Sequence, residues 1–144
     1  MTGLHYHYQV PGDDFTRAGE ASGAVKGLLK RLGLDPEVIR KLSIALYEGE
    51  INMVIHGGGG EIDVDIGPAG ITAVLADHGP GIPDVDKAME AGWSTAPDYV
   101  RNLGFGAGMG LPNMKKYADG LSVDSRVGEG TVVTIVVHTA PQGL

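Results

Sequence analysis

Three polar residues recur every four positions in DPEVIRKLSIALYEGEINMVIHG, residues 35–57. Glu48, Asn52 and His56 would stack along one side of a helix, because residues four apart lie above one another. The neighbouring positions are largely apolar, so a carboxylate and an amide there are costly unless something pairs with them. Mg²⁺ accepts such oxygen ligands and shares its coordination sphere with substrate phosphates. An internal hydrogen bond is the alternative for Glu48 and Asn52.

Two other residues of this segment are expected to have lesser roles. His56 comes directly before Gly57 at the end of the predicted helix. A histidine in that position is more often a helix cap than a ligand. Glu50 points away from the line of Glu48 and is expected to be a solvated surface acid.

An acid at the end of an apolar strand marks a second candidate site in ADHGPGIPD, residues 76–84. Asp77 could accept a hydrogen bond from an exocyclic amine such as that of adenine. Gly79 and Gly81 would let a flat base lie against the backbone. The alternative is a Gly-Pro turn onto which the Asp77 side chain folds.

Four glycines alternate with other residues in NLGFGAGMGLPNMKKYAD, residues 102–119. Such a run before a helix can cradle an anion, because exposed N–H groups and the helix dipole both favour negative charge. The run lacks the Gly-Lys-Ser/Thr ending of a P-loop. It follows a polar segment rather than the strand that a dinucleotide fingerprint requires. A loose loop leading into a glycine-rich helix start is the alternative.

The hydrophobic pattern predicts the elements that would position these residues. Asp35 is a suitable N-cap for the helix over 35–57, and Pro36 suits its first turn. The fold class is therefore α+β: a two-layer α/β sandwich with a mixed, mostly antiparallel sheet and helices on one face. Helices are expected over 14–32, 35–57, 84–91 and about 111–118, and strands over 4–10 (at an edge), 61–67, 70–77 and two segments of 120–139 around a GEG turn.

Composition limits the function classes. The chain has 144 residues with 42% hydrophobic content, which suits one globular domain over 1–144. A net charge of −7 with scattered basic residues argues against a nucleic-acid partner. No segment approaches the ~18 apolar residues of a membrane span, and no signal-peptide pattern is visible, so a cytoplasmic location is expected. Without cysteine there is no disulfide and no thiolate metal site.

In this order and spacing, the three stretches resemble the nucleotide site of the Bergerat-fold, or GHKL, ATPases, which include gyrase and histidine kinases. EGEIN (48–52) is similar to the asparagine box, and DHGPG (77–81) to the first glycine box. GFGAGMGL (104–111) is similar to the second glycine box, and GEGT (128–131) to a late strand whose threonine helps hold adenine. The likeness covers about residues 35–138. It is closest to the small bacterial anti-sigma-factor serine/threonine kinases.

The resemblance implies ATP and Mg²⁺ as cofactors and a role for each matching residue. Asn52 would coordinate the Mg²⁺ bound to the ATP phosphates, and Asp77 would take the adenine amine. Glu48 would be the general base that directs a serine or threonine hydroxyl toward the γ-phosphate. The other implied nucleotide-site residues are Gly79, Gly81, Ile82 and Thr131 around the base, Ser94 and Thr95 where a lid begins, and Gly104, Gly106, Gly108, Met109, Gly110 and Leu111 in or beside that lid.

The function implied is an ATP- and Mg²⁺-dependent serine/threonine protein kinase that acts on an anti-sigma-factor antagonist of the STAS type, and so regulates transcription. A sigma factor is a further candidate partner, and a homodimer is allowed. The alternative is a nucleotide-responsive module that sequesters a sigma factor or another regulator without phosphotransfer; plain ATP hydrolysis is a third interpretation. The candidate dimer or partner face comprises Leu4, Tyr6, Tyr8 and Phe15. Ala96 stands where some relatives carry a lysine, which leaves Arg101, Lys115 and Lys116 as candidates to contact the phosphates.

Overall fold

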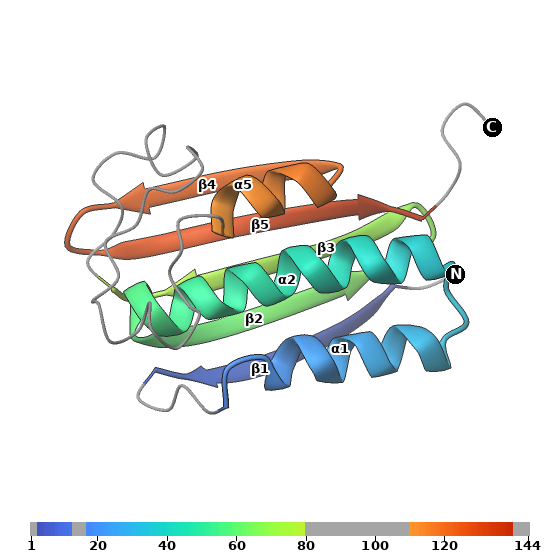
Figure 1. Ribbon diagram of the computed structural model, residues 1–144, viewed down its shortest axis with the longest axis horizontal. Coiled ribbons are helices and arrows are strands. Elements are labelled where there is room, and N and C mark those ends of the chain that lie inside the picture. Colours follow the sequence, from blue (N-terminus) through green and yellow to red (C-terminus); the bar gives the residue numbers. More distant parts are fainter. Residues whose placement is uncertain (1–2, 13–16, 80–109, 140–144) are drawn as a thin grey trace.

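The computed structural model describes residues 3–12, 17–79 and 110–139. Over these residues one sheet carries a layer of helices (Figure 1). The predicted helix over 84–91 lies outside the described residues. The helices are α1 (Glu20–Arg31), α2 (Pro36–Gly57) and α5 (Gly110–Tyr117), and the strands are β1 (Leu4–Pro11), β2 (Gly59–Ile66), β3 (Gly70–Asp77), β4 (Gly120–Arg126) and β5 (Gly130–His138).

The sheet has five strands in the order β1-β2-β3-β5-β4, with β1 at an edge as expected. Every neighbouring pair is antiparallel. The expectation of some parallel pairing was therefore wrong for the described strands. Short turns join β2 to β3 and β4 to β5, and such turns can connect only antiparallel neighbours. The α+β, two-layer prediction is confirmed.

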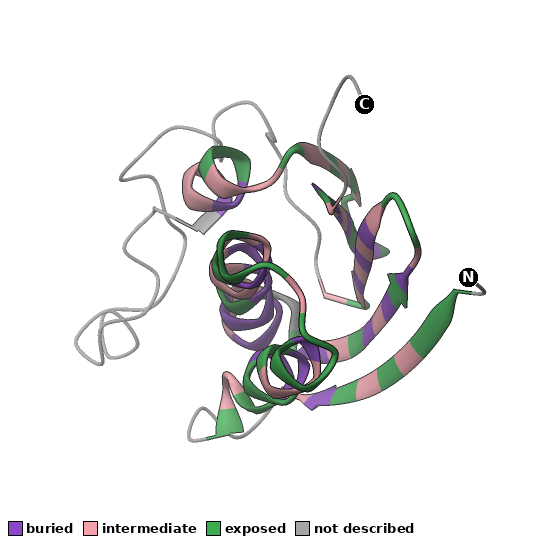
Figure 2. Cartoon of the chain, turned by 90° about the vertical axis from the view of Figure 1, so that its right-hand side faces the viewer, coloured by how far each residue is buried: buried purple, intermediate pink, exposed green. Residues whose placement is uncertain are grey.

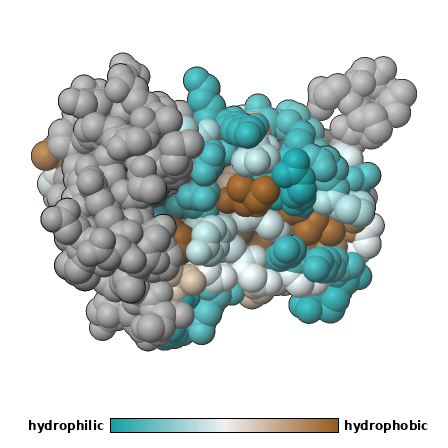
Figure 3. Space-filling view, in the orientation of Figure 1, coloured by the Kyte–Doolittle hydropathy of each residue, from teal (hydrophilic) through white to brown (hydrophobic). Residues whose placement is uncertain are grey.

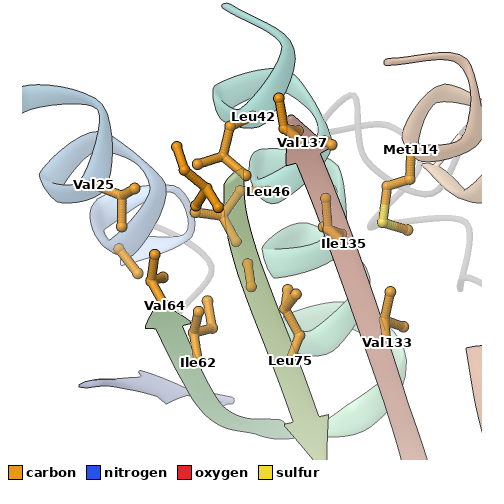
Figure 4. Packing of buried hydrophobic residues seen from close by; sticks show 14 of the residues in the cluster. Val25, Leu42, Leu46, Ile62, Val64, Leu75, Met114, Val133, Ile135 and Val137 are labelled. Atoms are coloured by element: carbon orange, nitrogen blue, oxygen red, sulfur yellow. The ribbon is translucent and has the colours of Figure 1, made fainter. Parts of the chain in front are cut away.

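Alternation along the strands explains why the helices cover one face. In β2, Ile62, Val64 and Ile66 are buried, while the residues between them are more exposed. The buried positions face the helices, which lie on one side of the sheet (Figure 2). Leu42 and Leu46 of α2 pack among side chains of β2, β3 and β5 (Figure 4). This central position of α2 fixes its C-terminal half over the end of β3.

Helix ends agree with the sequence expectations for α2 but not for α1. The Asp35 side chain accepts a hydrogen bond from the Glu37 N–H at 2.8 Å, which confirms the N-cap. Gly58, at φ 67°, caps the other end. The side chain of His56 is outside the described set, so its capping role stays a prediction. α1 begins at Glu20 rather than near residue 14, because Gly19 has φ 99° and interrupts the helical path.

The outer face of β1 and β2 carries charge pairs between strands. His5 contacts Asp65 at 2.7 Å and Asp63 at 3.1 Å, and His7 contacts Asp63 at 2.8 Å. The hydrogen bond to Asp65 raises the pKa of the exposed His5. On the opposite, helix-covered side, hydrophilic side chains surround the small apolar areas visible in Figure 3. Among the described helices, none is long and apolar enough to cross a membrane.

The candidate partner face on β1 is only partly available for contact. Tyr6 and Tyr8 pack against the core, whereas Leu4 is exposed. Phe15 lies outside the described residues. A dimer through this face therefore stays a prediction, and on β1 it would have to rely mainly on Leu4.

Candidate functional site

The described parts of the segments that hold the candidate residues lie at one end of the molecule. α2 and β3 run in the same direction, so the second half of α2 and the end of β3 lie together on the left of Figure 1. The first turn of α5 and the start of β5 lie at the same end. Glu48 and Asn52 belong to the second half of α2 and Asp77 ends β3, so all three belong to segments at this end of the molecule.

Glu48 occupies a half-buried position on α2 and faces α5. The Asn113 side chain donates a hydrogen bond from Nδ2 to Glu48 Oε1 at 3.4 Å. Burial raises the pKa of Glu48 above the usual glutamate value, and the Asn113 hydrogen bond opposes that rise. Glu48 thus combines partial burial and a raised pKa with a hydrogen bond to one of its two carboxylate oxygens.

Gly49, the next residue, lets α2 lie close to its neighbours. A Cβ at this position would lie 2.7 Å from Leu75 Cδ2 and 3.3 Å from Met114 Sδ. A glycine inside a helix costs about 1 kcal/mol relative to alanine. The close packing of Gly49 against the buried Leu75 and Met114 leaves no room for a larger residue, which explains a glycine here despite that cost.

Glu50 is buried rather than solvated, which corrects the sequence expectation. Its side chain is 1% exposed. The Oε2 atom accepts the N–H groups of Gly19 at 3.0 Å and Ala21 at 3.2 Å. The Oε1 atom accepts the Ser22 N–H at 2.9 Å and the Ser22 hydroxyl. Glu50 therefore caps the N-terminus of α1 from another helix, in place of a local side-chain cap.

Asp77 links the end of β3 to the start of β5. Its Oδ1 atom accepts the Gly79 N–H at 2.9 Å and the Thr131 N–H at 3.1 Å. The bond to Gly79 is the local turn that the sequence left as an alternative, and the bond to Thr131 joins residues 54 positions apart. Both of these hydrogen bonds go to Oδ1, so together they orient the carboxylate.

Gly130 allows β3 and β5 to approach closely enough for the hydrogen bond between Asp77 and Thr131. It has φ 127°, and a Cβ there would lie 2.2 Å from the Asp77 carbonyl oxygen. Any side chain would force the two strands apart next to the Asp77 carboxylate. Sequence reasoning did not single out this residue, although the GEGT pattern contains it. Thr131 itself is buried, and its hydroxyl lies 2.8 Å from Ser125 Oγ.

The remaining predicted residues differ in how far the structure places them. Asn52 is half-buried on α2, four residues beyond Glu48. Leu111 is 5% exposed and belongs to the core. Gly110 begins α5, where the glycine run ends. Lys116 lies over the Tyr117 ring in the last turn of α5. The predicted residues outside the described part of the chain are Gly81, Ile82, Ser94, Thr95, Ala96, Arg101, Gly104, Gly106, Gly108 and Met109.

The described residues supply few metal ligands. No group of three or more histidine, aspartate or glutamate side chains in the described part of the chain is arranged to hold a metal ion. Asn52 offers one amide oxygen. Mg²⁺ is commonly held by one or two side chains together with substrate phosphates and water. A single amide oxygen at Asn52 is compatible with this mode of Mg²⁺ binding.

The fold and this site define an α+β protein of the GHKL-like ATPase class. The chain belongs to the family of the histidine kinase-like ATPase domain, whose model matches residues 13–137. The resemblance seen in the sequence is thereby confirmed at the level of the family.

Individual relatives carry two kinds of name. The chain is 33% identical over 115 residues to the serine/threonine-protein kinase RsbT of Bacillus subtilis, a match that covers 77% of this chain and 80% of the relative. It is 34% identical over 110 residues to the anti-sigma F factor of Clostridium beijerinckii, covering 71% and 73%. It is 36% identical over 145 aligned positions to the anti-sigma F factor of Thermoanaerobacter pseudethanolicus, covering 96% and 93%.

A solved structure supports the fold alone. The crystal structure of the RsbU and RsbW domains of a Mycobacterium tuberculosis protein matches with a TM-score of 0.57 at 17% identity. The match covers 98% of this chain and 34% of that chain, so this chain spans about a third of the matched protein.

Proposed function

We propose that the chain is an ATP- and Mg²⁺-dependent serine/threonine protein kinase that phosphorylates a STAS-type anti-sigma-factor antagonist. Residues 1–144 would form one catalytic domain. The observation that carries the proposal is Glu48, a half-buried carboxylate on α2 whose Oε1 accepts a hydrogen bond from Asn113. Relatives named as a serine/threonine kinase and as anti-sigma F factors support the same interpretation.

The Asp77 region fits the adenine of ATP. The carboxylate is oriented by two backbone N–H groups on Oδ1. That arrangement leaves Oδ2 to accept the exocyclic amine of the base. Gly79 beside it adds no side chain that would obstruct a flat ring. The Asp77 carboxylate and the adjacent Gly79 are the structural features that support the proposed ATP site.

The chemistry assigned to the protein is positioning and proton transfer. Asn52 would hold the Mg²⁺, which neutralises phosphate charge when it is bound. Glu48 would accept the proton of the partner's hydroxyl while the oxygen of that hydroxyl forms a bond to the γ-phosphorus. The bond from that phosphorus to the bridging oxygen then breaks, and ADP leaves. The protonated Glu48 would return its proton to water.

The decisive experiment is phosphoryl transfer. The purified chain is mixed with γ-labelled ATP, Mg²⁺ and a STAS-type antagonist protein that carries its phosphorylatable serine or threonine. We expect label on the partner, dependent on Mg²⁺, and none on a partner whose acceptor residue is changed to alanine. Tight nucleotide binding without label transfer to any such partner would contradict the kinase.

A second function has its own support in the relatives named as anti-sigma F factors. The chain would then sequester a sigma factor, with nucleotide as a conformational ligand, either as a single chain or as a homodimer. Partner capture that depends on ATP but releases no ADP would favour this function. ADP release without any partner would instead indicate plain hydrolysis.

Asp77→Asn should lose ATP affinity by about a hundredfold while folding normally. The asparagine oxygen can still accept the N–H groups of Gly79 and Thr131, which fixes its NH₂ where Oδ2 was. Two donors, the amide and the adenine amine, would then face each other, at a cost of a few kcal/mol. Isothermal titration of ATP and ADP measures the loss. Asp124→Asn, on the exposed outer side of β4, is the matched control, and equal affinities of the Asp77 variant and this control would refute the adenine contact.

A further inference from the structure

The position of Asn113 is set by the packing of α5 rather than by its own contacts. Leu111 is 5% exposed and Met114 is fully buried, so these residues anchor α5 on the core. Met114 belongs to the same core cluster as Leu75 and Leu46 (Figure 4). Asn113, between the anchors, is directed to Glu48.

Gly49 allows this approach. Because it has no Cβ, Met114 of α5 can occupy the space beside α2, one residue along from Glu48. The same close packing that buries Met114 therefore brings the amide of Asn113 to the carboxylate. The contact spans 65 positions of sequence, and the packed helices rather than a local turn create it.

We propose that Asn113 is a positioning residue, which holds Oε1 of Glu48 so that Oε2 is presented to the substrate hydroxyl. This inference rests on the proposed role of Glu48 as the base. Asn113 would touch neither ATP nor the partner. It would act through the orientation and the charge of Glu48.

The charge effect follows from the two influences on Glu48. Burial favours the protonated acid, which cannot accept a proton, whereas a donor aimed at the carboxylate favours the charged base. Removing the amide should therefore raise the pKa of Glu48 further. The base would then be charged over a narrower pH range.

The first measurement is independent of activity. The pKa of Glu48 is followed by the chemical shift of its side-chain carboxyl carbon in glutamate-labelled protein, assigned by comparison with Glu48→Gln. We expect a rise of about 0.5–1 unit in Asn113→Leu, which keeps the size of the side chain but removes the donor. Asn113→Asp should raise it further, because a second negative charge is added.

Gln9→Leu is the matched control for this measurement. Gln9 also donates an amide N–H to a glutamate, Glu61, at 3.3 Å, but on the exposed strand pair. The Gln9→Leu substitution should leave the pKa of Glu48 unchanged. A Glu48 pKa that is the same in wild type and in Asn113→Leu would overturn the proposal.

The second measurement separates positioning from general damage. In the kinase assay, the acid limb of kcat/KM in Asn113→Leu should move up by the same amount as the pKa. The part of the loss that is due to charge should be regained at higher pH, and the part that is due to lost orientation should remain. A loss of activity without any shift of the acid limb would show a merely structural role and contradict the inference. If the wild type transfers no phosphate while the Glu48 pKa still shifts, the contact is upheld and the kinase is refuted.

Discussion

Glu48→Gln should reduce phosphoryl transfer by roughly a hundred- to ten-thousand-fold, the usual contribution of a general base. Glutamine has nearly the same shape, and its Oε1 can still accept the Asn113 hydrogen bond. It cannot accept a proton at neutral pH. ATP affinity should stay close to that of the wild type, because the adenine contact is assigned to Asp77 and not to Glu48.

The same substitution should not weaken the fold. The folded-state pKa of Glu48 lies above its unfolded value, so the folded protein binds that proton more tightly. The free energy of unfolding therefore falls as the pH rises from below the usual glutamate pKa through the raised one. The neutral glutamine side chain of the variant carries no such penalty. The free energy of unfolding of the variant minus that of the wild type should therefore be larger at about pH 7 than below about pH 4.

Two measurements check these expectations together. Label transfer to the STAS-type partner gives the kinetic loss, and urea unfolding at both pH values gives the stability change. Glu129→Gln, on the exposed turn between β4 and β5, is the matched control and should alter neither. Unchanged transfer in Glu48→Gln would remove Glu48 from the mechanism, whatever its effect on stability.

The sequence predicted most of the fold because its local signals agree with the final packing. The Asp35 cap and Pro36 mark the start of α2, and alternation in β2 and β3 marks their buried face. The start of α1 was placed too early. There, Gly19 interrupts the helical path and Glu50, from a distant segment, caps the helix. A pattern that depends on neighbouring residues contains no trace of the contact with Glu50.

The same limit explains what the sequence missed at the site. Residues 48–50 are adjacent in the chain, yet each faces a different element. Glu48 meets α5, Gly49 meets β3 and α5, and Glu50 meets the start of α1. Helical periodicity separates their directions, but it cannot tell which direction is solvent. Glu50 was expected to be exposed because it points away from the line of Glu48, whereas in the structure four donors compensate its burial.

Glu50→Ala should lower the free energy of unfolding by roughly 3–5 kcal/mol, a large share of the stability of a small domain. The substitution removes an acceptor that is 1% exposed. It leaves the N–H groups of Gly19, Ala21 and Ser22 without their partner, and each unsatisfied buried donor costs about 1–3 kcal/mol. Water entering the space would recover part of the loss, which is why the individual costs do not simply add.

A graded series tests whether hydrogen bonding to Glu50, rather than the volume of its side chain, stabilises α1. Ser22→Ala removes only the hydroxyl donor and should cost about 1–2 kcal/mol. Glu50→Gln keeps the volume but places an NH₂ group against at least one N–H donor, so it should fall between Ser22→Ala and Glu50→Ala. Glu129→Ala should stay within about 0.5 kcal/mol of the wild type. Chemical unfolding orders the four variants, and hydrogen exchange should show the greatest loss of protection at Ala21 and Ser22. If Glu50→Gln were as stable as the wild type, cavity formation would account for the alanine result and the capping role would fail.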